Sequence, residues 1–337
     1  MRCYEIQKFG LEGLAVAERP DPTPGHGEVL VRVAASSLNF RDHLMLQGHY
    51  NPKQKLPLIP NSDGAGTVAG VGPGVTRFKA GDRVAGIFSQ GWLAGAPMRE
   101  KMNGTLGSPL DGMLTELRVL HQDGLVHTPK HLSDEEAACL PCAGVTAWSA
   151  LVEHGAIKPG DTVLLQGTGG VSIFALQFAK LAGARVIITS SSDDKLARAR
   201  TLGADETINY KTTPDWDKKA RELTGGAGVD HIVEVGGGGT FGKSLRAVRI
   251  GGAISVIGVL SGATTDTSLI PILMQNLRLQ GIMVGSREMF EHMNAALSLS
   301  GTKPVIDRVF PFDQAPQAFA HMGSGAHFGK IVVKIAG

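Results

Sequence analysis

Residues 163–180 read VLLQGTGGVSIFALQFAK, and this stretch decides the fold of the second half of the chain. A short apolar run, a glycine-rich turn and an apolar helix pattern follow one another. Gly167 and Gly169, with Ser172 at the third position, have the spacing of a dinucleotide fingerprint, which requires this strand–turn–helix context. The first glycine permits a tight turn, and the second lets the backbone approach a pyrophosphate on the helix N-terminus. A glycine turn without a ligand is the alternative. The predicted phosphate contacts are Gly167, Thr168, Gly169, Gly170 and Val171.

Strand and helix patterns alternate outward from this stretch. Short apolar runs predict further strands at 185–190, 229–236, 253–259 and 279–285, and helical patterns occupy 193–203 and 240–252. This alternation indicates a parallel, doubly wound α/β sheet that is covered on both faces.

The end of the second predicted strand indicates which cofactor binds. An NAD site usually has a carboxylate there, which accepts hydrogen bonds from the ribose 2′-hydroxyl. Ser190 stands at that position, and Ser191 and Lys195 follow it. These three residues can bind a 2′-phosphate that a carboxylate would repel. The alternative is that the serines cap the next helix and the lysine is solvated. The sequence favours NADP(H).

The first third of the chain is rich in β-strands. Valine-rich runs at 28–37, 64–74, 81–88 and 114–120 are bounded by Gly, Pro and Asp, a pattern typical of an antiparallel or barrel-like region. Residues 88–113 lack periodicity and predict a long surface loop. A helix at 287–299 and a strand at 330–335 return to this region. We therefore expect one domain at 1–127 with 286–337, and a Rossmann domain at 128–285.

Composition narrows the class of protein. The 337 residues are 42% hydrophobic and 19% charged, with a formal net charge of +2 and no dense basic block. Nucleic-acid binding is not expected, and no segment has the length or character of a signal peptide or membrane span. Three cysteines cannot form a disulfide framework, which fits a cytoplasmic protein.

Several motifs along the chain are informative together, namely LNFRDHLMLQGHY, NSDGAGTVAGVG, LPCAGVTAWSAL, LGADETINY and HFGKIVV. In combination they resemble the medium-chain dehydrogenase/reductase superfamily, in its zinc-independent quinone oxidoreductase branch. The resemblance implies a β-rich GroES-like catalytic domain beside the Rossmann domain, a small-molecule substrate and a homodimer. It also implies further cofactor contacts at Tyr210, Val235, Gly236, Ile257, Gly258, Val259, Val284, Gly285 and Lys330; an exposed lysine is the alternative for the last.

The resemblance also locates the positions where zinc-containing relatives keep their ligands. Those positions here are Asn39, the pair Ser62–Asp63, and Cys142. One thiolate cannot hold a catalytic zinc that needs three protein ligands, so no zinc is expected. Weak metal binding by Asp63 and Cys142 is the alternative, and otherwise Cys142 is a packed thiol.

Without a metal, the substrate oxygen has to be polarised by hydrogen bonds as hydride reaches carbon. The resemblance points to Asn39 and Tyr50 as the catalytic pair, with a turn residue and a surface aromatic as the structural alternatives. Arg41 and Asp42 are expected to form a structural ion pair. The expected acceptor is a quinone or another activated carbonyl or enone. An enoyl thioester reductase and a non-catalytic NADPH-binding protein are the competing hypotheses.

Overall fold

The computed structural model describes residues 1–335, which form two compact units. One unit comprises Met1–Val145 together with the chain from Gly285 onward, and the other comprises Thr146–Val284. The first unit therefore includes residues 128–145, which the sequence analysis assigns to the Rossmann domain. The reason is that α3 (Asp134–Ala137) packs against strands of the first unit's sheet.

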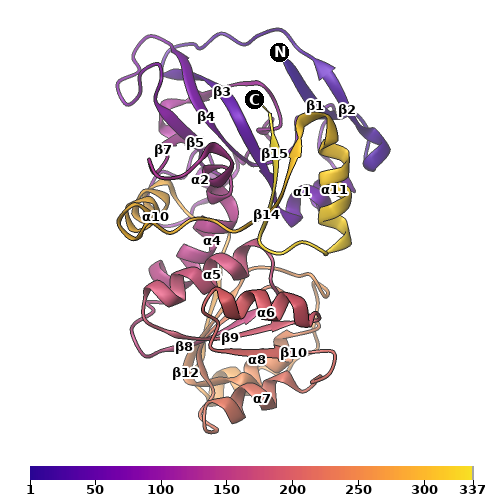
Figure 1. The fold of residues 1–337 in the computed structure, drawn as a ribbon, viewed down its shortest axis with the longest axis vertical. Helices are drawn as coiled ribbons and strands as arrows, with labels where there is room; N and C mark the ends of the chain where they lie inside the picture. Colours follow the sequence, from indigo (N-terminus) through magenta and orange to yellow (C-terminus); the bar gives the residue numbers. More distant parts are fainter. Residues whose placement is uncertain (336–337) are drawn as a thin grey trace. The chain divides into compact units, whose positions relative to one another are not determined.

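The second unit contains a six-stranded, fully parallel sheet (Figure 1). Its strands are β8 (Thr162–Gln166), β9 (Arg185–Ser190), β10 (Glu206–Asn209), β11 (Val229–Glu234), β12 (Val248–Val256) and β13 (Arg278–Gly281). Their order, β10-β9-β8-β11-β12-β13, is that of the doubly wound dinucleotide-binding fold. The prediction of a Rossmann sheet is confirmed.

Helices cover both faces of this sheet, with α5 and α6 on one side and α7 and α8 on the other (Figure 1). Their bounds are α5 (Gly170–Leu181), α6 (Asp193–Thr201), α7 (Trp216–Leu223) and α8 (Phe241–Ala247), and shorter helices are α4 (Val145–Trp148) and α9 (Ile270–Met274). Leu164 and Ile232 from the central strands pack with Trp216 of α7 and Leu245 of α8 in one buried cluster. Strands enclosed in this way are apolar on both faces, which explains their unbroken hydrophobic runs.

One predicted helix is too long. The pattern over 240–252 predicts a single helix, but α8 ends at Ala247 and β12 begins at Val248. Val248 is fully buried and pairs with Val229 of β11, so sheet pairing outweighs the helical pattern from this residue onward.

The first unit contains a seven-stranded sheet and a small hairpin. The sheet order is β14-β15-β3-β4-β5-β7, with β6 also paired to β3, and β1 pairs with β2. The strands are β1 (Arg2–Ile6), β2 (Leu14–Glu18), β3 (Glu28–Leu38), β4 (Asp63–Val71), β5 (Arg83–Gly86), β6 (Leu117–His121), β7 (Leu125–His127), β14 (Ile306–Pro311) and β15 (Lys330–Lys334). Besides α3, the α-helices of this unit are α1 (Phe40–Leu46), α2 (Arg99–Met102), α10 (Arg287–Ser300) and α11 (Ala315–Ser324). The pairing of β15 with β3 brings the C-terminal chain beside the N-terminal region.

The segment 88–113 is only partly the surface loop that the sequence predicts. It is largely irregular, but Trp92 and Leu106 are buried, and Ser89 forms a β-bridge with Thr105. The Trp92 indole donates a hydrogen bond to the carbonyl of Gly95 at 2.9 Å. Apolar anchors therefore hold this segment against the first unit, although its sequence lacks periodicity.

Candidate functional site

The glycine-rich turn lies at the carboxyl end of β8, where the strand order of the second sheet reverses. Gly167 has φ +70°, a left-handed conformation that strains other residues, and the space around it is open. Gly169 is the N-cap of α5, and no side chain caps the first turn of this helix. The backbone N–H groups of that turn have no partner within the helix, and the residues present fit a cofactor pyrophosphate there.

Ser172 shows why the third fingerprint position tolerates a residue other than glycine. Its side chain is buried, and its hydroxyl donates a 2.6 Å hydrogen bond to the carbonyl of Gln166 at the end of β8. The serine therefore connects α5 to the strand where glycine would only allow close packing.

A buried polar network that the sequence analysis missed supports the same edge of the sheet. Gln166 ends β8 and Glu234 ends β11, and the Gln166 amide donates to the Glu234 carboxylate at 2.7 Å. Glu234 is fully buried and also accepts from the backbone N–H groups of Gly236 and Gly237 at 2.9 Å. Further donors to this carboxylate are the Thr240 and Ser244 hydroxyls. The only sign of this network in the sequence is that a polar residue ends each of two apolar strands.

The predicted contacts after β11 and β12 lie in two loops that bond to each other. The N–H of Ser261 donates to the Gly236 carbonyl, and the N–H of Leu260 donates to the Val235 carbonyl. Ile257 and Gly258 donate to the Glu234 carbonyl. The structure thus places Val235, Gly236, Ile257, Gly258 and Val259 together at the carboxyl edge, and their cofactor contacts remain predictions.

Val284 has an unusual backbone conformation. Its φ of +58° lies in the left-handed region, which a β-branched residue rarely adopts, and the side chain is buried. Strain of this kind is concentrated at functional sites. Val284 ends the second unit, and Gly285 begins the chain's return to the first.

Of the residues predicted to bind the 2′-phosphate, Ser190 ends β9, Ser191 follows it and Lys195 lies in α6, while Tyr210 follows β10. Ser190 is buried, its hydroxyl accepts from the N–H of Ser192, and its carbonyl accepts from the N–H of Tyr210. The N-cap of α6 is Ser192, which accepts from the N–H of Lys195 at 3.4 Å. Ser192 therefore caps α6, one residue after Ser191 and two after Ser190, so neither of those serines is the helix cap.

A second polar cluster lies in the first unit, beginning at Asn39. This residue follows β3 and precedes α1, and its backbone N–H donates to the Asp42 carboxylate at 2.8 Å. Its side-chain Nδ2 donates to the Ser62 hydroxyl at 3.4 Å, and its Oδ1 accepts from the Lys330 ammonium at 2.6 Å. Asn39 thus begins the turn into α1 through its backbone and also contributes a polar side chain to the cluster.

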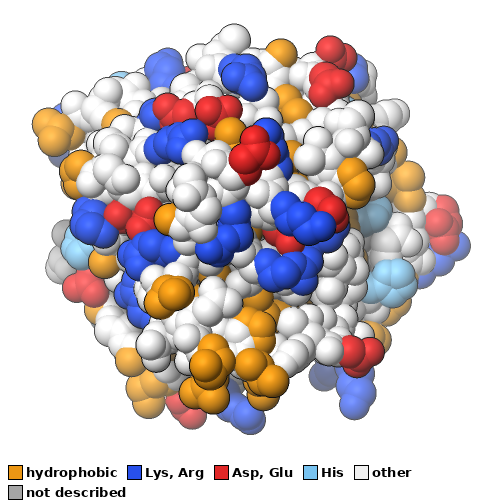
Figure 2. All heavy atoms as spheres, turned by 90° about the horizontal axis from the view of Figure 1, so that it is seen from below, with side chains coloured by type: hydrophobic (Ala, Val, Ile, Leu, Met, Phe, Trp, Pro, Cys, Tyr) orange, Lys and Arg blue, Asp and Glu red, His pale blue; other side chains and the backbone are white. Residues whose placement is uncertain are grey.

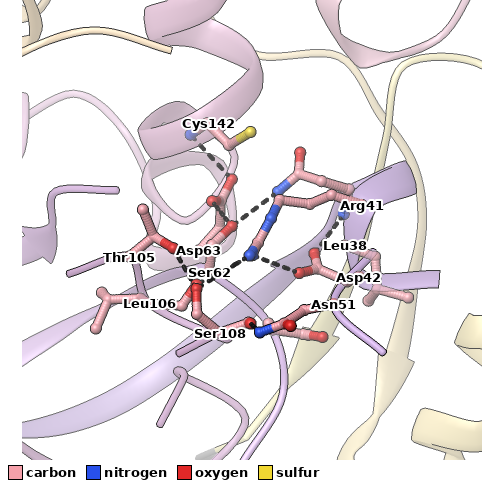
Figure 3. Close-up of polar contacts among 12 residues, drawn as sticks. Leu38, Arg41, Asp42, Asn51, Ser62, Asp63, Thr105, Leu106, Ser108 and Cys142 are labelled. Atoms are coloured by element: carbon pink, nitrogen blue, oxygen red, sulfur yellow. Dashed lines mark hydrogen bonds and ion pairs between the residues drawn. The ribbon is translucent and has the colours of Figure 1, made fainter. Parts of the chain in front are cut away.

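Tyr50 contacts a different partner from Asn39. The Arg41 guanidinium lies 4.7 Å from the centre of the Tyr50 ring and 4.9 Å from that of Phe88. Arg41 also forms the predicted ion pair with Asp42, at 3.3 Å, and donates to the Leu106 carbonyl (Figure 3). Burial raises the pKa of Asp42 to about 6 although Arg41 opposes this. Among residues 1–335, no hydrogen bond or ring contact joins Tyr50 to Asn39.

The positions that the resemblance assigns to zinc ligands lie close together here and bond to one another (Figure 3). The Asp63 carboxylate accepts from the Ser62 hydroxyl at 2.7 Å and from the Cys142 backbone N–H at 3.2 Å. Lys330 Nζ lies 3.6 Å from the same carboxylate. Burial raises the pKa of the Cys142 thiol, and the Asp63 charge raises it further.

This donor set is a poor match for zinc. The Asp63 carboxylate is already engaged, because it lies 3.6 Å from the Lys330 ammonium and accepts a hydrogen bond from the Ser62 hydroxyl. Asn39 and Ser62 supply weak neutral oxygens in place of the remaining ligands. Within residues 1–335, no group of three or more His, Cys, Asp or Glu side chains is arranged to hold a metal ion.

Lys330 is buried in the first unit, which contradicts the alternative of an exposed lysine. It is 2% exposed at the start of β15, and its ammonium donates to the Leu38 carbonyl at 2.8 Å as well as to Asn39. It is therefore not the exposed lysine of the alternative, and its cofactor contact remains a prediction. The pairing of β15 with β3 brings it to the Asn39 cluster.

A Rossmann unit with an open glycine turn is typical of dinucleotide-binding proteins. Residues 25–130 match the family model of the alcohol dehydrogenase GroES-like domain, and residues 170–299 match that of the zinc-binding dehydrogenases. The chain belongs to the medium-chain dehydrogenase/reductase superfamily, and the predicted family and fold are confirmed.

Similar curated proteins include several enzymes. A zinc-type alcohol dehydrogenase-like protein of Schizosaccharomyces pombe is 48% identical over 92% of this chain and 91% of its own. A chloroplast envelope quinone oxidoreductase homolog of Arabidopsis thaliana is 31% identical over 98% and 97%. An acryloyl-coenzyme A reductase of Sulfurisphaera tokodaii is 30% identical over 96% and 97%.

Solved structures share the fold over the whole chain. A putative alcohol dehydrogenase from Sinorhizobium meliloti has a TM-score of 0.93 at 44% identity, covering 99% of this chain and 98% of its own. An NAD-dependent alcohol dehydrogenase has a TM-score of 0.92 at 37% identity, with 100% of both chains covered. A mycobacterial protein complexed with NADPH has a TM-score of 0.84 at 27% identity, covering 99% and 100%.

Proposed function

We propose that this protein is an NADPH-dependent oxidoreductase that reduces a quinone, or another activated carbonyl or enone, without a metal ion. The observation that carries the proposal is the Asn39 cluster. At the positions that the resemblance assigns to zinc ligands, this cluster has a hydrogen-bond donor, a buried ion pair, and a cysteine whose backbone N–H bonds to Asp63. NADPH, when bound, supplies a hydride. The side-chain amide of Asn39 donates to the acceptor oxygen and stabilises the negative charge that develops there.

An enoyl thioester is the second candidate acceptor. It is favoured by the similarity to an acryloyl-coenzyme A reductase, which the chain matches over nearly its whole length. Hydride addition to an enoyl thioester also places charge on a carbonyl oxygen, so the same Asn39 donor would serve both reactions.

The experiment that distinguishes these acceptors follows the loss of NADPH absorbance. An ortho-quinone, an α,β-unsaturated ketone, an enoyl thioester and a simple aldehyde are supplied in parallel. Fast turnover of the quinone or the enone supports the first proposal, and selective turnover of the thioester supports the second. Tight NADPH binding without turnover of any acceptor would instead favour a non-catalytic NADPH-binding protein.

The cofactor preference is proposed to depend on Ser190. Replacing Ser190 with aspartate is expected to raise KM for NADPH at least about tenfold without a matching rise for NADH, because a carboxylate repels the 2′-phosphate. Steady-state kinetics with both cofactors measure this. Ala227→Asp adds the same charge at an exposed position of the same unit and should change neither KM. Equal effects of Ser190→Asp on both cofactors would contradict the proposal.

We also propose that the protein is a homodimer formed through the second unit. β13 is an edge strand, and exposed apolar side chains lie nearby in sequence on Leu269, Ile270, Leu273 and Met274. Figure 2 shows hydrophobic side chains gathered on one face of the molecule. Such patches usually mark interfaces. Light scattering is expected to give twice the chain mass of 35.4 kDa, and Leu273→Glu to give the monomer. A monomeric wild-type protein would contradict this.

We propose that the protein is located in the cytoplasm. Its proposed partner is a small-molecule substrate, and no nucleic-acid partner is expected. The near-neutral net charge of +2 and the free thiols Cys3, Cys139 and Cys142 support this proposal. None of the helices in residues 1–335 combines the length and apolar character that a membrane crossing requires.

A further inference from the structure

The Lys330 ammonium is held on all sides by acceptors of the first unit. Its three N–H donors face the Leu38 carbonyl at 2.8 Å, the Asn39 amide oxygen at 2.6 Å and the Asp63 carboxylate at 3.6 Å. The side chain is 2% exposed. A lysine is rarely buried to this extent unless its charge is paired, so this placement requires a reason.

Local structure explains how the lysine reaches this position. Gly329 has φ +79°, and a Cβ there would lie 2.4 Å from the Val305 carbonyl oxygen, so only glycine fits before Lys330. The residue after Lys330, Ile331, pairs with Leu38 in the antiparallel ladder of β15 and β3. Lys330 is thereby fixed beside the end of β3, where Asn39 begins the turn into α1.

The chemistry of an ammonium group determines the orientation of the Asn39 amide. An ammonium has only donors, so it can bond only to the amide oxygen. The amide nitrogen must then point the other way, where it makes the long 3.4 Å contact with Ser62. Asn39 therefore presents donors on the side away from Lys330, and rotating the amide would bring two donor groups together.

We propose that Lys330 is a positioning residue that fixes Asn39 as a hydrogen-bond donor toward the acceptor oxygen. This inference rests on the proposed function, in which Asn39 polarises that oxygen. The positive charge against Oδ1 also withdraws electron density from the amide and strengthens its N–H donors. Lys330 thus acts through Asn39 and touches neither substrate nor cofactor.

The test is a double-mutant cycle between Lys330→Met and Asn39→Ala. Lys330→Met keeps an unbranched side chain that is one atom shorter, and it removes the charge and the donors. It is expected to lower kcat about 10- to 100-fold with the dissociation constant of NADPH unchanged, and to have almost no effect in an Asn39→Ala background. A full additional loss in that background would overturn the proposal. So would a weakened NADPH affinity with unchanged kcat, which would indicate a phosphate contact.

A second variant covers the case in which Lys330→Met does not fold. Removing the ammonium leaves the buried Asp63 carboxylate without its cation, which is strongly destabilising. Lys330→Met with Asp63→Asn removes both charges and still removes the group that orients Asn39. The same loss of kcat is expected for this pair, and near wild-type kcat would overturn the proposal.

A spectroscopic readout separates this inference from the proposed reaction. In protein labelled with ¹⁵N-asparagine, the Asn39 side-chain signal is assigned from its absence in Asn39→Ala. It is expected to shift in Lys330→Met, whereas the Asn51 side-chain signal should not. If the wild-type protein reduces no acceptor, the proposed function fails, but a shifted Asn39 signal still supports the orientation by Lys330. An unshifted signal overturns it.

Discussion

Replacing Asn39 with alanine is expected to lower kcat about 10²- to 10³-fold, the usual effect of removing one donor to a developing oxyanion. The side chain is nearly buried and is held by Lys330 and Ser62, so its donors are oriented before the acceptor arrives. Steady-state kinetics with the best acceptor measure kcat and KM. NADPH affinity, from the quenching of protein fluorescence, should not change, because the glycine-rich turn that is predicted to bind the pyrophosphate belongs to the other unit.

Asn51→Ala is a matched control for this prediction. Asn51 belongs to the same unit and also uses its amide nitrogen, toward Gln54 at 3.2 Å and Ser108 at 3.3 Å, but it lies outside the Asn39 cluster. We expect its kcat to stay near the wild-type value. An Asn39→Ala protein that folds and keeps kcat within about twofold of wild type would remove the basis of the mechanism.

Replacing Glu234 with alanine is expected to lower the free energy of unfolding by about 3–5 kcal/mol, because several buried donors lose their acceptor together. Those donors are the Gln166 amide, the Gly236 and Gly237 backbone N–H groups, and the Thr240 and Ser244 hydroxyls. Denaturant unfolding measures the change. NADPH affinity should also fall, because the loop after β11 loses its anchor.

Glu222→Ala provides the comparison. Glu222 also belongs to the second unit, but it is an exposed residue that pairs with Lys219 on the surface of α7. Its replacement is expected to cost less than about 1 kcal/mol, as for other surface ion pairs. A similarly small loss for Glu234→Ala would mean that the buried network does not hold this edge of the sheet.

Local patterns explain what could be predicted from the sequence. The strand, glycine turn and helix at 163–180 are contiguous, and each requirement of the fingerprint is met within a few residues. Buried parallel strands are also recognisable, because both of their faces are apolar. The same reasoning failed at Val248, where pairing with a distant strand decides the structure.

Long-range pairing explains what could not be predicted. Lys330 and Asn39 are 291 positions apart, and no spacing rule connects them. Only the β15–β3 ladder brings them together. Glu234 and Gln166 are likewise 68 positions apart and meet because β11 and β8 are neighbours. The sequence predicted Asn39 as a site residue, but its contact with Lys330 became visible only in the fold.

The most direct test of the central claim measures turnover and zinc content of the same preparation. Purified protein is treated with a chelator, its metal content is determined, and NADPH-dependent reduction of the best acceptor is compared before and after treatment. The account predicts no stoichiometric zinc and unchanged turnover, because hydrogen bonding from Asn39 takes the place of a metal. Loss of activity on chelation that added Zn²⁺ restores would contradict it, and would make Asp63 and Cys142 metal ligands.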